Sequence, residues 1–64
     1  MNITRKVLDK KVIEDTTLIL FEKKEKFFAT MDGKDIYTSY SRQDVVDYYN
    51  ACVEYLQFVA SIKI

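Results

Sequence analysis

Residues 27–40 read FFATMDGKDIYTSY, in which Asp32-Gly33 separates two runs rich in aromatic and β-branched residues. Asp-Gly between such runs is a strong short-range signal for a two-residue hairpin, because the favoured turn needs a positive φ at both positions. Gly33 is the one glycine of the chain. The sequence therefore predicts two antiparallel strands that meet at this turn.

A two-residue turn also predicts which side chains share a face of the hairpin. The expected pairs are Met31 with Lys34, Ala29 with Ile36, and Phe27 with Thr38. The face that carries these apolar side chains is the better candidate for the core, because Ala29 lets a helix approach closely. Phe28 then lies opposite Tyr37 on the other face, where the aromatic pair either stabilises the hairpin or forms part of a contact surface.

The segment before the hairpin predicts one or two further strands. Residues 16–22 are short and rich in β-branched and aromatic side chains, and Lys23-Lys24-Glu25 follows as the turn into the next strand. Earlier, Val12-Ile13 favour an extended chain, although Val7 and Leu8 follow Ile3 at helical spacing. We expect an N-terminal strand over residues 7–15, with a helix as the alternative.

The pattern changes at Ser41, which opens a long helix. Ser41 and Asp44 have the spacing of a capping box, in which a serine oxygen accepts from an orphan backbone amide. The helix is predicted over residues 42–61. The expected fold is α+β: a single domain over residues 1–64, with an antiparallel β-meander of three to four strands within residues 7–40, packed by one long C-terminal helix.

The predicted helix is apolar over more of its circumference than one sheet can bury. One stripe, suited to cover the sheet, comprises Val45, Tyr49, Cys52, Val53, Leu56, Val59 and Ala60. A second, which we call the outer stripe, comprises Tyr48, Ala51, Tyr55, Phe58 and Ile62. Its 3-4-3-4 spacing is that of a coiled-coil seam. Three partners could cover it: residues 1–12 of the same chain, a second copy, or a different protein.

The composition limits the chemistry available to this chain. It has 64 residues, one cysteine and no histidine, so an internal disulfide is impossible and a structural zinc site is improbable. A catalytic site needs a nucleophile with its base, a metal or a tuned acid–base pair, and Cys52 falls on the core stripe. We therefore expect no enzyme, no cofactor and no metal. No apolar run is long enough to cross a bilayer, so a cytoplasmic protein is expected, in the host cytoplasm if the gene is viral.

The formal net charge is zero, yet the lysines are unevenly distributed. Those before the hairpin are Lys6, Lys10, Lys11, Lys23, Lys24 and Lys26. Basic strands with Phe28 and Tyr37 pointing outward could bind nucleic acid by stacking and charge. Lysine also blunts exposed strand edges, which explains the same residues without a ligand.

A short, histidine-free, lysine-rich chain is similar in size and composition to small accessory proteins of phages and mobile elements. Such proteins often occupy a site on a larger host protein. We therefore expect a non-catalytic protein-binding modulator or inhibitor, with a small nucleic-acid-binding protein and a structural homodimer subunit as alternatives. The partner-binding residues predicted are Tyr48, Tyr55, Phe58 and Ile62 on the helix, and Phe28 and Tyr37 on the hairpin.

Overall fold

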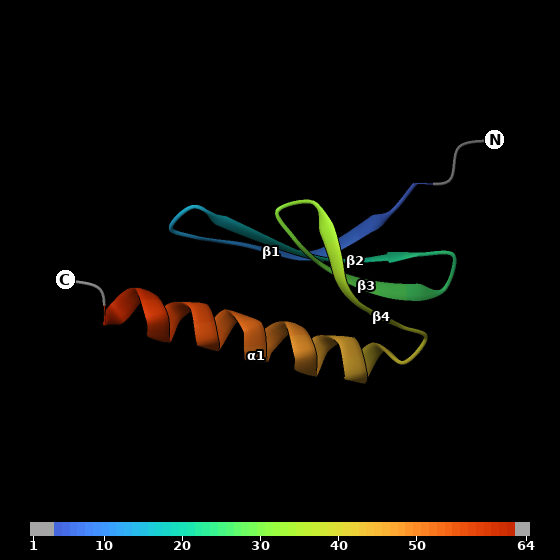
Figure 1. The fold of residues 1–64 in the computed structure, drawn as a ribbon. Coiled ribbons are helices and arrows are strands. Elements are labelled where there is room, and N and C mark those ends of the chain that lie inside the picture. The colour runs from blue at the N-terminus through green and yellow to red at the C-terminus, as the bar shows by residue number, and fades with distance from the viewer. Residues whose placement is uncertain (1–3, 63–64) are drawn as a thin grey trace.

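The computed structural model describes residues 4–62, which form a four-stranded antiparallel sheet followed by one helix (Figure 1). In chain order, the elements are β1 (Lys6–Ile13), β2 (Thr16–Lys23), β3 (Lys26–Met31), β4 (Lys34–Ser39) and α1 (Arg42–Ser61). The strands lie in the order β1-β2-β3-β4. This confirms the predicted α+β meander with a C-terminal helix, and the N-terminal segment is a strand rather than a helix.

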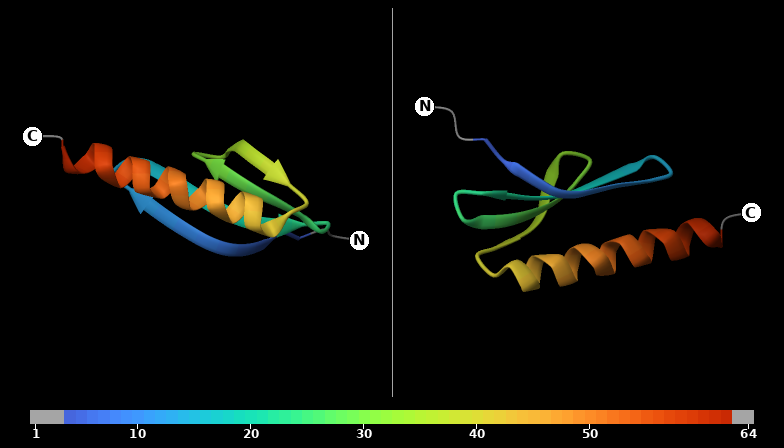
Figure 2. Two further views of the ribbon diagram at one scale, coloured as in Figure 1. Left: turned by 90° about the horizontal axis from the view of Figure 1, so that it is seen from below. Right: turned by 180° about the vertical axis from the view of Figure 1, so that it is seen from behind.

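The helix covers one face of the sheet and contacts all four strands. Figure 2 shows α1 crossing the sheet, with its C-terminal end near the hairpin that joins β1 and β2. No other element among residues 4–62 covers the opposite face, which we call the open face. Among residues 4–62, no helix combines the length and the hydropathy that are needed to span a membrane.

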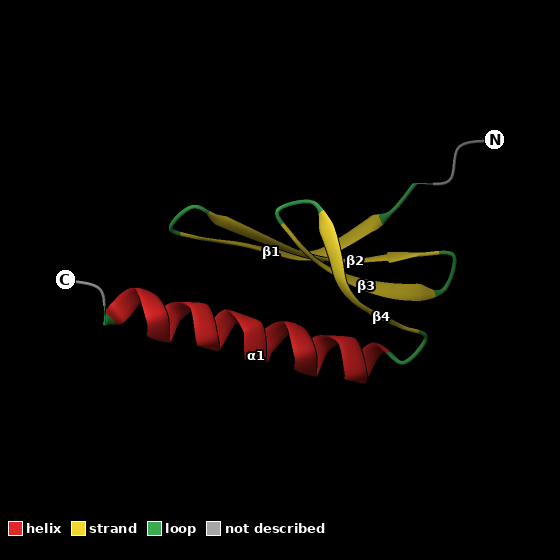
Figure 3. Cartoon of the chain, viewed as in Figure 1, coloured by secondary structure: helices red, strands yellow, loops and turns green. Residues whose placement is uncertain are grey.

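The turns between strands are tight, as the short loops in Figure 3 show. Asp32 and Gly33 have φ values of 51° and 86°, which confirms the predicted turn with positive φ at both central positions. Asp32 also ties this turn to β2: its amide donates to the carbonyl oxygen of Thr17 (2.8 Å), and the Thr17 amide donates to Asp32 Oδ1 (2.9 Å). The turn that decides the hairpin is therefore also joined to the neighbouring strand.

A register shift separates the observed hairpin from the predicted one. Met31 pairs with Lys34 as expected, but an irregularity between Ala29 and Thr30 brings Ala29 opposite Tyr37 instead of Ile36. Beyond it, the partner of Phe27 is Ser39 rather than Thr38, and that of Phe28 is Thr38 rather than Tyr37. The predicted pair of Phe28 and Tyr37 is therefore wrong. An extra residue in β4 moves Tyr37 to the face that the helix covers.

The core lies between α1 and the two central strands. Leu18, Leu20 and Ala29 supply the sheet side, and Val45, Tyr49 and Val53 supply the helix side. Ala29 is completely buried, in agreement with its predicted role in allowing the helix to approach. Ile36 packs against this cluster from β4, although its register differs from the expected one.

Tyr49 is the largest side chain buried in this core. It is 1% exposed, and its hydroxyl donates to the carbonyl oxygen of Leu18 at 3.3 Å. A register shift in β1, between Val7 and Asp9, places Asp9 opposite Leu20 and hence on the helix side of the sheet. Burial raises the pKa of the Tyr49 hydroxyl, and the negative charge of the nearby Asp9 carboxylate raises it further.

This shift predicts a loss of stability at high pH. An unfolded tyrosine has a pKa of about 10, and the folded value is higher, so the folded state favours the neutral phenol. The contribution of Tyr49 is present below pH of about 10 and is lost as the pH rises through the folded pKa. We expect Tyr49→Phe to cost about 1 kcal/mol at neutral pH. Above pH of about 10, the variant should lose stability less steeply than the wild type, as measured by urea unfolding. If the stabilities of the wild type and Tyr49→Phe fell equally steeply with pH, Tyr49 would not be the source of the loss.

The turn between β2 and β3 carries a conformational cost that substitution should remove. Lys24 and Glu25 have φ values of 52° and 64°, a region that favours glycine and asparagine. We expect the double substitution Lys24→Asn with Glu25→Gly to stabilise the fold by about 1 kcal/mol in urea unfolding. Lys24→Gln with Glu25→Gln removes the same two charges but relieves neither positive φ, so it is the matched control and should change stability little. A double variant no more stable than this control would show that the turn is not strained.

Candidate binding surfaces

The outer stripe of α1 is exposed. The exposed fractions are 39% for Tyr48, 66% for Tyr55, 62% for Phe58 and 59% for Ile62. Ala51, between the first two, is exposed as well. The side chains of the core stripe at Val45, Tyr49 and Val53 are buried, so the helix shows the two adjacent stripes that its sequence predicts.

An apolar hollow of about 360 Å³ separates the first half of the outer stripe from the sheet. It is lined by Met31, Tyr48, Ala51, Cys52, Tyr55 and Leu56. Cys52, which the sequence places in the core, is half-buried and packs against the core while it lines this hollow. The hollow therefore continues the apolar surface of the stripe toward the core.

Tyr48 is the member of the stripe that is held by the sheet. Its ring stacks on that of Tyr37, with centroids 4.7 Å apart and planes 12° from parallel. This contact exists because the irregularity in β4 turns Tyr37 toward the helix. The sequence predicted that Tyr37 lies beside Phe28. In the structure, Tyr37 borders the outer stripe instead.

The N-terminal segment does not cover the outer stripe. Residues 6–13 form β1, an edge strand hydrogen-bonded to β2, and Tyr55 and Phe58 remain mostly exposed. The prediction that residues 1–12 fold over this stripe is therefore wrong for residues 6–12, and residues 1–3 lie outside the described part. The physical reason is that Lys6–Ile13 satisfies its backbone hydrogen bonds in the sheet.

The open face of the sheet carries a second cluster, built on two aromatic rings. Phe21 and Phe28 are cross-strand partners, and their rings stack with centroids 4.9 Å apart and planes 7° from parallel. The Arg5 guanidinium lies 4.7 Å from the centre of the Phe21 ring, on which it forms a cation–π contact. The Lys26 ammonium lies 5.8 Å from the centre of Phe28 and 5.4 Å from that of Tyr40.

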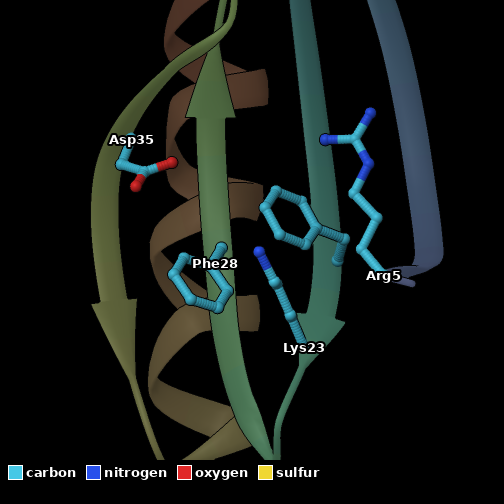
Figure 4. Close-up of a pocket in the computed structure, with 5 residues that line it drawn as sticks. Arg5, Lys23, Phe28 and Asp35 are labelled. Carbon is cyan, nitrogen blue, oxygen red and sulfur yellow. The ribbon is translucent and has the colours of Figure 1, made fainter. Parts of the chain in front are cut away.

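A hollow of about 350 Å³ opens over this cluster and is shown in Figure 4. It is lined by Arg5, Phe21, Lys23, Phe28 and Asp35. A neighbouring hollow is lined by Lys23, Lys24, Lys26, Phe28 and Tyr40. Phe28 and Lys23 border both. The lining of the two hollows therefore combines three aromatic rings with several cations and the carboxylate of Asp35.

Sequence reasoning identified Phe28 and the lysines on the open face but missed Phe21 and Arg5. Phe21 and Lys23 are two residues apart in β2, so their side chains lie on the same face of the sheet. The pairing of Phe21 with Phe28 places the two rings side by side. Alternation along residues 16–26 was the available signal for Phe21, since it faces the same side as Lys23. Arg5 precedes β1, so no strand pattern predicts its position.

Among residues 4–62, no group of cysteine and acidic side chains could hold a metal ion. The chain matches no protein-family model, no curated protein and no solved structure.

Proposed function

We propose that the protein is a small non-catalytic binding protein that associates with a second copy of itself through the outer stripe of α1. The observation that supports this most directly is the exposure of Tyr55 and Phe58, at 66% and 62%, on a helix whose other stripe is buried. Large apolar side chains in a continuous exposed row are typical of interaction surfaces. Aromatic residues at such positions commonly supply much of the binding energy.

The size of the stripe is suited to a modest interface. A covered aromatic side chain buries roughly 150–250 Å², so the exposed parts of the stripe amount to on the order of 400 Å². A standard interface buries about 800 Å² on each partner. The stripe would supply about half of that area, and the apolar hollow beside Cys52 would extend it toward the sheet.

A second copy is the occupant best supported by the stripe's pattern. Its 3-4-3-4 spacing lets two identical helices pack along their length. From Tyr48 to Ile62 the stripe carries no ionisable group except tyrosine hydroxyls, so self-pairing buries no unpaired charge. A chain of this size also has a small core, and association is one of the few staples open to it without a disulfide.

The modulator role predicted from the sequence would use the same stripe against a host protein. That role needs an apolar groove or helix on the partner in place of a second copy. The acidic side chains Asp44, Asp47 and Glu54 on the same helix would then favour a partner with a basic rim.

Charge placed in the stripe tests self-association. We expect the wild type to be a dimer by light scattering, and Tyr55→Glu and Phe58→Glu to be monomers, because an unpaired charge at the interface costs several kcal/mol. Both positions are mostly exposed, so the folded monomer should tolerate the changes. Asn50→Glu, on the polar side of α1, adds the same charge outside the stripe and should remain dimeric.

Two outcomes would overturn self-association. One is a monomeric wild type at the highest concentration reached, with unfolding unchanged in Tyr55→Glu and Phe58→Glu. The other is loss of the dimer in Asn50→Glu to the same extent as in the stripe variants, which would indicate a general charge effect.

A further inference from the structure

We propose that the open face of the sheet binds single-stranded nucleic acid, with a base stacked at Phe28 and the phosphates held by Arg5, Lys23 and Lys26. This site is separate from the outer stripe and does not depend on self-association. Stacking on aromatic side chains combined with a basic groove is how proteins bind single strands with little sequence preference.

The aromatic part of the site is a stack of the Arg5 guanidinium, the Phe21 ring and the Phe28 ring. The Arg5 guanidinium lies over Phe21, and Phe21 stacks on Phe28, so cation and rings form a column. Phe21 is only 7% exposed and has no free face for a ligand. Phe28 is half-buried and borders both hollows. Apart from Phe21, the Lys26 ammonium lies over this ring, at 5.8 Å from its centre. A base can reach Phe28 when this flexible side chain turns from the ring to a phosphate. A base placed there would extend the column by one member.

The charges of the open face suit a polyanion. Pairing with Ile19 places Lys10 on this face, and the alternation of β2 and β3 places Lys23 and Lys26 there. Asp35, opposite Thr30, is the acidic member. By contrast, α1 carries Asp44, Asp47 and Glu54 on the other side of the sheet. The neutral chain is therefore polarised, which directs a polyanion to the open face and away from the helix.

One pairing in this cluster is unfavourable without a ligand. Lys23 and Lys26 are direct cross-strand partners, and like charges at such positions destabilise a sheet. They flank the turn at Lys24 and Glu25, both of which have positive φ. A phosphate between the two ammonium groups would convert this repulsion into two charge-assisted contacts.

Asp35 closes the hollow on the side away from Arg5, as Figure 4 shows. A carboxylate repels phosphate but accepts hydrogen bonds from the amino groups of bases. It would therefore direct the base toward β4 and the backbone toward Arg5 and Lys23. A simple anion would gain nothing from Asp35, whereas a nucleotide has groups for both sides of the hollow.

Fluorescence anisotropy with labelled mixed-sequence single strands of DNA and of RNA, over a salt series, tests this site. For three phosphate contacts, the affinity should fall with a log–log salt slope of about −2. We expect Phe28→Ala to weaken binding by about ten-fold or more. Lys23→Gln and Lys26→Gln should each reduce the slope by about 0.7. Lys11→Gln, opposite Leu18 on the helix side of the sheet, removes the same charge and should leave the slope unchanged.

Stability provides a second measurement in case Phe28→Ala does not fold. Lys23→Gln removes the repulsion with Lys26, so it should unfold at a higher urea concentration than the wild type while binding more weakly. The monomeric variant Tyr55→Glu should retain binding, which separates this site from the outer stripe. The proposal is overturned by absence of binding at low salt, by equal losses in Lys11→Gln and Lys23→Gln, or by equal affinity for duplex and single strand.

Discussion

Contact between α1 and the two central strands is the interaction on which the rest of the structure depends. Ala29 presents only a methyl group to the helix, so Tyr49 can be buried in the core and reach the carbonyl oxygen of Leu18. The contact buries one stripe of the helix and one face of the sheet. Because residues 4–62 contain a single helix, a second apolar stripe and a second sheet face are left to solvent. Both candidate surfaces are therefore consequences of one packing event.

The irregularity in β4 decides how those two surfaces are divided. In a regular hairpin, Phe28 and Tyr37 would lie together on one face and form a single aromatic patch. The extra residue instead sends Tyr37 to the helix side, where it stacks on Tyr48, and leaves Phe28 to stack on Phe21. One aromatic pair thus joins the sheet to the outer stripe, and the other supports the basic cluster on the open face. A bulge of this kind redirects side chains without a change of strand order.

Much of this fold was predictable because its signals are local. The Asp32-Gly33 turn, the capping serine at Ser41 and the two stripes of the helix all follow from neighbouring residues, and the structure confirms each of them. The register beyond Ala29 was not predictable, since Ile36 and Tyr37 are adjacent apolar residues and the pattern does not show which of them is the extra one. For the same reason the stack of Phe21 on Phe28 escaped notice: it depends on the pairing of two strands, and alternation within one strand does not reveal its partner. The cation–π contact of Arg5 with Phe21 was not predictable either, because Arg5 lies outside any strand or helix.

The two surfaces also differ in what they can bind, and that difference follows from charge. The outer stripe lacks charged groups between Tyr48 and Ile62, so it suits a partner that excludes water, whereas the open face places cations beside the rings of Phe28 and Tyr40. Association through the helix would leave the sheet uncovered, because α1 packs against the opposite face. Two copies joined in this way would present two basic sheets. Self-association and nucleic-acid binding would therefore be compatible in one molecule.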